Sequence, residues 1–407
     1  MRIVVAMSGG VDSSVAAALL AEQGHDVIGL SMQLYDQSEG QTSFGSCCSI
    51  DDLHDARKVA AAINIPHYIL NFEQQFDEQV IANFVSEYAA GRTPLPCAHC
   101  NSDLKFATLA DRARGFGADA VATGHYARVE RGADGRHLLR RGVDPGKDQS
   151  YFLFSLTQAQ LAGAIFPVGA LPKDEVRHYA RQHRLPVADK PDSQEICFIP
   201  DHDYRAFVTK SVPEAARDGQ FVDQAGRVLG RHAGIHRFTV GQRKGLGLSS
   251  STGAPMYVLA LRPADQQVIV GPKASLEQTT LTASGVNWIA AEPAGPLRVA
   301  AQIRHHHQAA PAALRSLGEG RAAVIFDEPQ LAISPGQAIV FYDGDTVVGG
   351  GWIDSEKTAE GAKNAELISL RSRRSPRFFP RPPRDAQGSC RGGVPRRSRP
   401  CSLILRP

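Results

Sequence analysis

The sequence predicts an α/β protein in which an N-terminal doubly wound parallel sheet precedes a small central β-rich domain and a C-terminal β-barrel. The chain opens strand–loop–helix–strand, since residues 3–20 combine an apolar run, a glycine loop and a helix, and residues 25–35 form the next apolar run. Helical periodicity fades from about residue 203, where glycine turns separate short β runs. From about residue 276, evenly spaced short strands with turn signals are typical of a small barrel.

The remaining elements of the first half alternate between helix and strand. We predict helices over 51–63, 73–91 and 173–186 and a further helix that begins near Asn101. Strands are predicted over 65–72 and 118–130, and the latter breaks at Thr123-Gly124-His125. A short hairpin-like piece lies within 136–156, and residues 256–271 are predicted to form a hairpin.

These patterns divide the chain into four parts. Residues 1–202 form the predicted sheet domain, 203–275 the central β-rich domain and 276–357 the barrel. Residues 358–407 are rich in Arg and Pro with little apolar periodicity, so we expect this tail to be disordered.

The composition is that of an ordinary globular protein, with 43% hydrophobic and 21% charged residues among 407. The sequence contains no run of about 18 apolar residues, so no membrane-spanning helix is predicted. The N-terminus enters a strand at once, which argues against a signal peptide. We therefore expect a cytoplasmic protein without a membrane partner. The seven Cys are then expected to be thiols, metal ligands or catalytic groups rather than structural disulfides.

The net charge of +3 is unevenly distributed. Residues 371–407 hold eleven Arg and one Asp, a net +10, which leaves −7 for the rest of the chain. Any surface that binds nucleic acid must therefore be local.

The loop Ser8-Gly9-Gly10-Val11-Asp12-Ser13-Ser14 follows the first predicted strand. Small residues and a helix start aim several N–H groups at one point, which suits a phosphate, and Asp12, Ser13 and Ser14 can cap the helix. The loop lacks the lysine of GxxxxGK[ST] and is not GxGxxG. It resembles the SGGxDS PP-loop of ATP pyrophosphatases, which split ATP to AMP and pyrophosphate while adenylating a substrate. Thiolases, lysidine synthetases and several amidotransferases carry similar loops.

Three cysteines are candidates for chemistry. Cys97 and Cys100 form a C-x-x-C, which is not a structural zinc site without a second pair. Cys100 is expected at the start of the helix near Asn101, where the dipole stabilises a thiolate. From its local context alone, Cys197 is a core residue of a short apolar element.

Five motifs in order identify a closer resemblance. These are SGGVDSS, CNSDLKF at 100–106, TGHYAR at 123–128, KDQSYFL at 147–153 and DSQEICFIP at 192–200. Together they resemble the tRNA-specific 2-thiouridylase family over about residues 1–355. GQRKGLG at 241–247, Arg-His-His at 304–306 and SPGQAIVFYDG at 334–344 resemble its distal domains.

The resemblance implies ATP-dependent transfer of sulfur to carbon 2 of the wobble uridine of tRNA, with Mg²⁺ and a persulfide donor, either a relay protein or a cysteine desulfurase. Cys100 matches the nucleophile and Cys197 the persulfide carrier, and the two would form a transient disulfide. The implied ATP-binding residues are Ala6, Met7, Ser8, Gly9, Gly10, Val11, Asp12, Ser13, Met32 and Gly124. The implied tRNA-binding residues are Leu95, Pro96, Cys97, His125, Lys147, Asp148, Gln149, Arg304, His305, His306 and Gln337.

Two departures from the family pattern leave alternatives open. Leu95-Pro96-Cys97 stands where the family commonly has Asn-Pro-Asp, so a thiol replaces an acid. Cys97, Cys100 and Cys197 are then also candidates for the ligands of an iron–sulfur cluster, as in other PP-loop thiolases. The second departure is the tail 358–407, which lies outside the family pattern. An alternative function of a different class is that of a protein that binds tRNA and catalyses no reaction.

Overall fold

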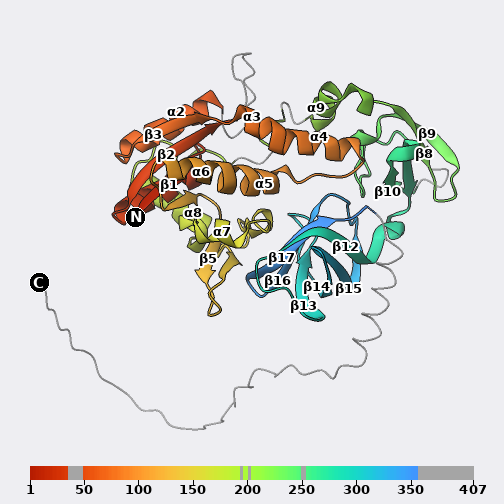
Figure 1. The fold of residues 1–407 in the computed structure, drawn as a ribbon. Coiled ribbons are helices and arrows are strands. Elements are labelled where there is room, and N and C mark those ends of the chain that lie inside the picture. Colours follow the sequence, from red (N-terminus) through yellow and green to blue (C-terminus); the bar gives the residue numbers. More distant parts are fainter. Residues whose placement is uncertain (35–48, 193–195, 200–202, 249–253, 356–407) are drawn as a thin grey trace, which may run out of the picture.

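The structure is a computed structural model that describes residues 1–34, 49–192, 196–199, 203–248 and 254–355. It contains three sheets (Figure 1). A parallel N-terminal sheet, a four-stranded central sheet and a C-terminal antiparallel barrel follow one another along the chain, so the predicted fold class is confirmed. The predicted tail 358–407 lies outside the described residues.

The N-terminal sheet has the strand order β3-β2-β1-β4-β7. The strands are β1 (Arg2–Ala6), β2 (Asp26–Gln33), β3 (His67–Asn71), β4 (Ala120–Thr123) and β7 (Ala164–Ile165), all paired in parallel. The crossovers place α1 (Val11–Glu22) after β1 and α2 (Ile50–Ala62) after β2.

Both faces of this sheet are covered by helices because its central strand is apolar on both sides. Ile3 and Val5 of β1 pack with α1 and α2, whereas Val4 between them belongs to the core under the helices of residues 73–115. Apolar residues are therefore consecutive at Ile3-Val4-Val5, whereas a strand with one face in solvent would alternate apolar and polar residues.

Two long helices of this domain contain π-helical turns. The first runs through α3 (Glu73–Phe76), a π-turn (Asp77–Ile81) and α4 (Ala82–Ala89). The second runs through α5 (Pro96–His99), a π-helical segment (Cys100–Thr108) and α6 (Leu109–Gly115). The second helix thus begins at Pro96 and not near Asn101. The residue Pro96 itself explains this earlier start, since proline favours the first position of a helix.

The predicted strand 118–130 is two strands in different sheets. After β4, the chain breaks at Gly124 and continues as β5 (Ala127–Arg131), which forms a hairpin with β6 (His137–Arg141). The hairpin extends the barrel sheet, where Arg140 of β6 pairs with Thr346. The domain ends with α7 (Gln158–Ala162) and α8 (Lys173–Gln182).

The central unit begins with α9 (Tyr204–Ser211) and contains a sheet of order β10-β11-β8-β9. Its strands are β8 (Asp218–Val222), β9 (Val228–Ala233), β10 (Tyr257–Arg262) and β11 (Gln267–Gly271). β10 and β11 form the predicted antiparallel hairpin. A small separate core around Phe221 and Val258 supports this sheet.

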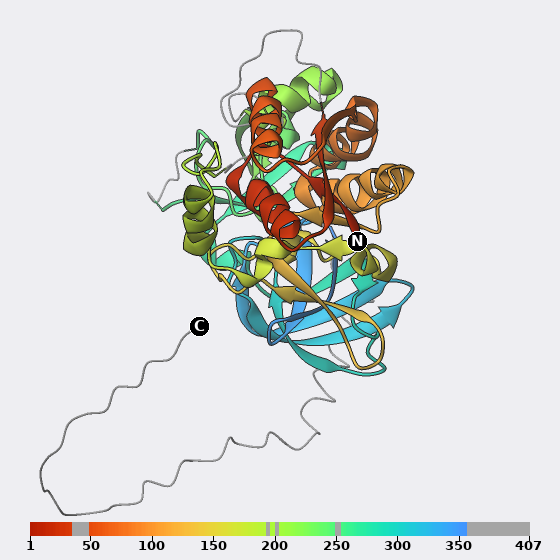
Figure 2. The same cartoon turned by 90° about the vertical axis from the view of Figure 1, so that its left-hand side faces the viewer.

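Six antiparallel strands close the barrel because β12 pairs with both β15 and β17 (Figure 2). They are β12 (Glu277–Trp288), β13 (Leu297–Gln302), β14 (Ala310–Gly318), β15 (Arg321–Leu331), β16 (Ala338–Asp343) and β17 (Thr346–Ile353). Alternate residues such as Val324 and Phe326 fill its interior.

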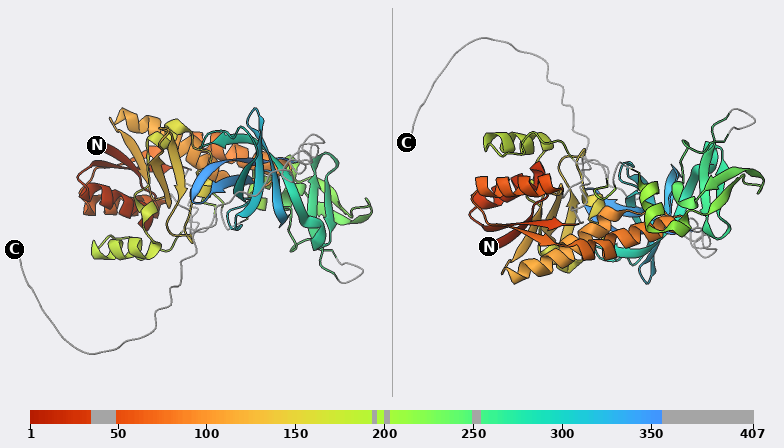
Figure 3. Two further views of the ribbon diagram at one scale, coloured as in Figure 1. Left: turned by 90° about the horizontal axis from the view of Figure 1, so that it is seen from below. Right: turned by 90° about the horizontal axis from the view of Figure 1, so that it is seen from above.

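The barrel packs directly on the N-terminal domain, and the central sheet lies at the far end of the molecule (Figure 3). Val340 and Tyr342 of β16 belong to the same hydrophobic core as Leu153 and Phe154. Tyr151 also donates a 2.8 Å hydrogen bond to the carbonyl of Ala338. Within the described ranges, no helix is long and apolar enough to cross a membrane.

Candidate active site

The glycine loop between β1 and α1 is tightly folded. Gly9 has φ of +72°, and a Cβ there would lie 2.2 Å from the carbonyl oxygen of Asp52, so only glycine fits. The hydroxyl of Ser13 accepts from the Ser8 N–H at 3.2 Å and donates to the Gly10 carbonyl at 3.2 Å. These bonds close the loop over the start of the helix.

The expected side-chain caps of α1 are absent from this loop. The helix begins at Val11, and its N-cap residue Gly10 makes no side-chain capping bond. Ser13 and Ser14 instead donate back to the Gly10 carbonyl, because both already lie within the first helical turn. The helix N-terminus therefore has no side-chain cap, which suits an incoming anion.

Predicted ATP-binding residues from three strands lie at one edge of the sheet. Ala6 of β1 is in register with Leu30 of β2 and with Thr123 of β4, so β1 and β4 end at the same level and β2 continues beyond them to Gln33. Met32, near the end of β2, is 7% exposed. A Cβ at Gly124 would lie 2.5 Å from the backbone nitrogen of Ser13, so β4 runs directly against the loop. This edge is where doubly wound sheets bind ligands.

Two lysines that carry no sequence motif lie against the loop. The Lys173 ammonium bonds both carboxylate oxygens of Asp12, at 2.7 and 2.8 Å, and Tyr126 donates to the same carboxylate at 2.7 Å. Lys190 donates to the Gly9 carbonyl at 3.1 Å. Lys190 also pairs with two carboxylates of α2, those of Asp52 and Asp55.

Asp192 collects further charges beside Lys173. Its carboxylate pairs with Lys147, Lys173 and Arg177 at 2.7–2.8 Å. Hydrogen bonds from the two lysines outweigh partial burial and lower the pKa of Asp192 to about 2. Sequence analysis missed Lys173, Lys190 and Tyr126, and the only signal for Asp192 was its place at the start of the DSQEICFIP motif.

The cysteines occupy different environments. Cys97 is exposed in the first turn of α5, whereas Cys100 lies one turn later and is half-buried. The expectation that Cys100 starts the helix is therefore wrong, because the helix begins at Pro96 and dipole stabilisation falls off within the first turn. Cys197 is also half-buried, and it packs against the same hydrophobic core as Cys100 and Met32.

Within the described residues, the three thiols are not arranged as ligands of one metal ion. In the part of the chain that the structure describes, no three Cys, His, Asp or Glu side chains gather closely enough to hold a metal ion. Cys97, Cys100 and Cys197 thus form no such group.

Five of the expected tRNA-binding residues are buried or bonded within the protein. Leu95 and Pro96 are buried. The Asp148 carboxylate pairs with Arg141 at 2.7 Å and accepts two backbone N–H groups. Two amide side chains hold neighbouring backbone: Gln149 accepts from the Tyr126 N–H, and Gln337 donates to the carbonyls of Thr93 and Pro94.

The other six divide into three that reach solvent, Cys97, Lys147 and His306, and three that are partly buried, His125, Arg304 and His305. Cys97 and His306 are exposed, and the Lys147 side chain is 38% exposed. His125 is hydrogen-bonded to the Thr123 hydroxyl through Nδ1 at 2.6 Å, and burial lowers its pKa well below the ordinary value, so the ring is neutral at pH 7.

The barrel loop after β13 reaches the short helical turn Ser150–Phe152, which follows the loop of Lys147. The His305 ring lies 4.5 Å, centroid to centroid, from Phe152, and Arg304 donates to the carbonyl of Leu331. Burial and the neighbouring His306 lower the pKa of His305. His305 of the barrel thereby lies against the segment of the sheet domain that directly follows the expected tRNA-binding residues 147–149.

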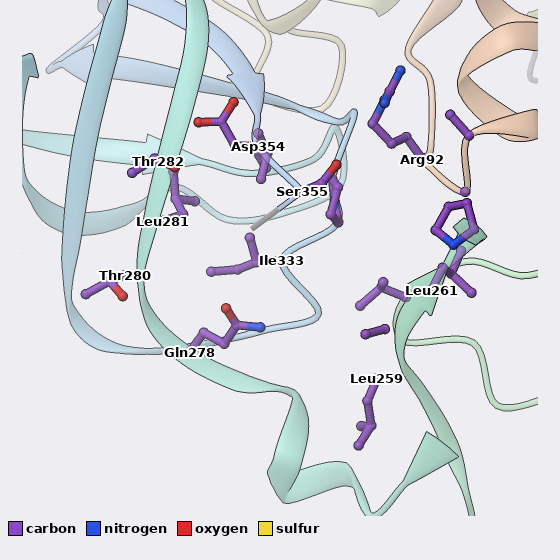
Figure 4. A pocket seen from close by; sticks show the side chains of 17 residues that line it. Arg92, Leu259, Leu261, Gln278, Thr280, Leu281, Thr282, Ile333, Asp354 and Ser355 are labelled. Atoms are coloured by element: carbon purple, nitrogen blue, oxygen red, sulfur yellow. The ribbon is translucent and has the colours of Figure 1, made fainter. Parts of the chain in front are cut away.

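A cavity of about 470 Å³ lies elsewhere, where three parts of the chain meet (Figure 4). Its walls come from Arg92 after α4, from Leu259 and Leu261 of β10, and from β12 and the end of β17. None of the expected site residues lines this cavity. It marks the junction of the N-terminal domain, the central unit and the barrel.

Comparison with known proteins gives matches along nearly the whole described chain. Three family models match in succession: a tRNA methyl transferase HUP domain over residues 1–201, a tRNA methyl transferase PRC-barrel domain over 205–272, and an aminomethyltransferase β-barrel domain over 278–353. The tRNA-specific 2-thiouridylase MnmA of Geotalea uraniireducens is 51% identical over 370 residues, which cover 90% of this chain and 98% of the relative. The protein of the same name from Geobacter metallireducens is 53% identical over 362 residues, which cover 88% and 98%.

Proposed function

This chain belongs to the tRNA-specific 2-thiouridylase family, and from that membership and its site we propose that it is a tRNA-uridine 2-sulfurtransferase. It replaces the oxygen on carbon 2 of the wobble uridine with sulfur and uses ATP as the activating substrate. The observation that carries the assignment is the glycine-loop edge of the parallel sheet, where Gly124, directly after β4, lies against the start of α1, which has no side-chain cap.

The first half-reaction is adenylation. The uridine oxygen on carbon 2 attacks the α-phosphorus of ATP, and pyrophosphate leaves. Ser8, Gly9 and Gly10 present small side chains and backbone to the phosphates, and the uncapped start of α1 favours the negative charge. The Asp12 carboxylate is already bonded at both oxygens by the Lys173 ammonium and also accepts from Tyr126, so Mg²⁺ would be held by the phosphate oxygens of ATP and by water, where it would neutralise phosphate charge.

The second half-reaction is sulfur transfer. The terminal sulfur of a Cys197 persulfide attacks carbon 2 and the adenylated oxygen departs as AMP, which leaves the base joined to Cys197 through a disulfide. The Cys100 thiolate attacks the Cys197 sulfur, so that the transferred sulfur leaves on the base and a Cys100–Cys197 disulfide forms. An external dithiol reductant then restores both thiols.

The partners follow from this chemistry. The protein needs tRNA and a persulfide donor, which is a sulfur-relay protein or a cysteine desulfurase, and we place it in the cytoplasm. The eleven residues given above as tRNA-binding are the proposed contacts. Cys97, Lys147 and His306 are the most exposed of them, and the buried ones would act by holding the loops that touch RNA.

The test is reconstitution with the full chain, ATP, an unmodified tRNA transcript and a persulfide donor. Mass spectrometry of the nucleosides should find 2-thiouridine at the wobble position only when ATP is present. Asp12→Ala and Ser8→Ala should stop pyrophosphate release while tRNA binding persists. Unmodified uridine in the complete reaction, or 2-thiouridine formed without ATP, would contradict the proposal.

A further inference from the structure

The barrel loop between β15 and β16 lies against the segment that leads into α5. The side-chain amide nitrogen of Gln337 carries two N–H groups, and it donates to the carbonyl oxygens of both Thr93 and Pro94, each at 3.1 Å. The Thr93 N–H in turn donates to the Pro335 carbonyl at 2.8 Å. Three hydrogen bonds therefore join this barrel loop to two consecutive residues of the N-terminal domain.

Gly336 makes this contact close. Its φ is +83°, and a Cβ there would lie 2.9 Å from the Arg92 Cβ and 3.0 Å from the Thr93 nitrogen. Glycine is the residue that lets two segments approach so closely at such a φ. The loop is itself fixed to the last strand of the barrel, because Gly336 donates to the Ile353 carbonyl at 3.0 Å and Ile353 donates to the Gln337 carbonyl at 2.9 Å.

The segment that receives these bonds is stiff and leads directly to the proposed nucleophile. Thr93 and Leu95 each precede a proline, which restricts their backbone dihedrals, and Pro94 and Pro96 have a fixed φ. The two prolines and the leucine between them are also buried. Pro96 is the first residue of α5, and Cys100 lies one turn later. A shift of the two anchored carbonyl groups is therefore transmitted to the helix that carries Cys100.

We propose that Gln337 is a positioning residue that holds this helix in place, so that Cys100 can release the thiolated base from its disulfide with Cys197. The inference rests on the proposed function. It assigns to Gln337 no contact with the reacting atoms, and the residue acts on the reaction through the protein rather than through the RNA. Loss of its two amide bonds should slow the release of thiolated tRNA more than adenylation, because the bonds that close the glycine loop do not involve this segment.

The experiment compares Gln337→Glu with wild-type full-length protein in single turnover at saturating tRNA. Glutamate has nearly the size of glutamine, but when ionised it donates no hydrogen bond to the two carbonyls. Cys197 is first loaded with sulfur from a persulfide donor, the donor is removed, and no reductant is added. Pyrophosphate release, free 2-thiouridine tRNA and the covalent protein–tRNA disulfide are then measured, together with the Kd for tRNA.

The expected result separates the steps of the reaction. Gln337→Glu should keep pyrophosphate release and the Kd for tRNA within about threefold and slow the release of 2-thiouridine tRNA about tenfold or more, since a misplacement of about 1 Å can cost far more than that. The protein–tRNA disulfide should accumulate on a non-reducing gel, and dithiothreitol should release 2-thiouridine tRNA from it. Gln337→Met removes the same donors without adding charge, so it supplies the same test if Gln337→Glu does not fold.

The matched control is Gln158→Glu. The side-chain amide of Gln158, in α7, also donates to two backbone carbonyls, those of His137 and Ile289, each at 2.9 Å. These bonds likewise join the N-terminal domain to the barrel, but they hold β6 rather than the segment before α5. This variant should lose a similar amount of stability, while product release keeps its rate and no disulfide accumulates.

The outcomes are distinct. Weaker tRNA binding by the Gln337 variants, with a normal release rate at saturating tRNA, would show that this residue contacts RNA and would overturn the positioning role. Normal rates throughout, equal slowing of pyrophosphate and product release, or the same pattern in Gln158→Glu would also overturn it. Wild-type protein that forms no 2-thiouridine would instead overturn the proposed function.

Discussion

The imidazole ring of His99 stacks on the indole of Trp352, with centroids 4.8 Å apart and planes inclined by 2°. His99 directly precedes Cys100, and Trp352 lies in β17, the last strand of the barrel. The barrel therefore touches the helix that carries the proposed nucleophile, across about 250 residues of sequence.

Trp352→Ala is expected to slow 2-thiouridine formation about tenfold by loosening this helix. The stacking and packing lost should also lower the free energy of unfolding by about 3 kcal/mol. The matched control is Trp288→Ala, since Trp288 stacks on Phe341 within the barrel. The thermal unfolding temperature should fall by a similar amount in the two variants. The rate of thiolation should fall mainly in Trp352→Ala. Equal activity in both would show that the His99 contact does not position Cys100.

Gly124→Ala tests the close approach of β4 to the glycine loop. The added Cβ would lie 2.5 Å from the Ser13 nitrogen and 2.6 Å from the Asp12 carbonyl carbon, and both are backbone atoms. We expect a loss of about 2 kcal/mol in stability and a larger loss of pyrophosphate release than of tRNA binding. Gly115→Ala adds the same methyl group where no heavy atom lies within 4 Å, so it should change neither the stability nor the pyrophosphate release. Normal pyrophosphate release by Gly124→Ala would argue against a nucleotide at this edge.

Asp192 should also control stability in acid. Its folded-state pKa is lowered from 3.8 to about 2 by Lys147 and Lys173. A lowered pKa means that the stabilisation is fully present above about pH 4 and is lost as the pH falls toward 2; it is worth about 2 kcal/mol. The unfolding free energies of wild type and Asp192→Asn, measured by urea titration, should therefore converge between pH 4 and pH 2. A difference that stays constant over that range would contradict the assigned ion pairs.

Local patterns predicted the fold where the determining contacts are local. The apolar run Ile3-Val4-Val5 followed by two glycines indicated a buried parallel strand and its loop, and both are observed. The β5–β6 hairpin was misassigned because its place is set by Arg140 pairing with Thr346, about 200 residues away. No local pattern records such a pairing.

The site was predicted only as far as its motifs extend. The glycine loop and Gly124 come together as their strand-end positions imply. Lys173 was missed because a lysine at the start of an amphipathic helix normally faces solvent, whereas this one is buried between two aspartates that are distant in sequence. The helix start at Pro96 was missed because the glycines and prolines before Cys97 suggested a loop that continued to Asn101.

Removal of residues 358–407 is expected to leave thiolation within about twofold of wild type at physiological salt. The barrel is closed before that point, since Ile353 of β17 pairs with Ala283 of β12. The eleven Arg of the tail should add only salt-sensitive, non-specific affinity for RNA. Thiolation and tRNA binding at low and physiological salt check this, and a truncated protein that cannot thiolate would show that the tail is needed.

Cysteine variants separate the persulfide route from an iron–sulfur route. Cys197→Ser should leave adenylation of tRNA intact and stop sulfur transfer, because it removes the persulfide carrier. Cys100→Ser should also stop turnover, while Cys197 still accepts labelled sulfur from the donor. Radiolabelled sulfur on the protein and pyrophosphate release measure the two half-reactions.

Cys97→Ser decides between the routes. Cys97 is exposed in the first turn of α5, and among the described residues it belongs to no group that could hold a metal ion. On the persulfide route, this variant keeps both the nucleophile and the carrier, so most of the activity should remain. On the cluster route it removes one of three ligands, and iron and activity should disappear together. We expect iron-free wild-type protein to thiolate tRNA with a persulfide donor; strict dependence on reconstituted iron and sulfide would replace this mechanism with the cluster route.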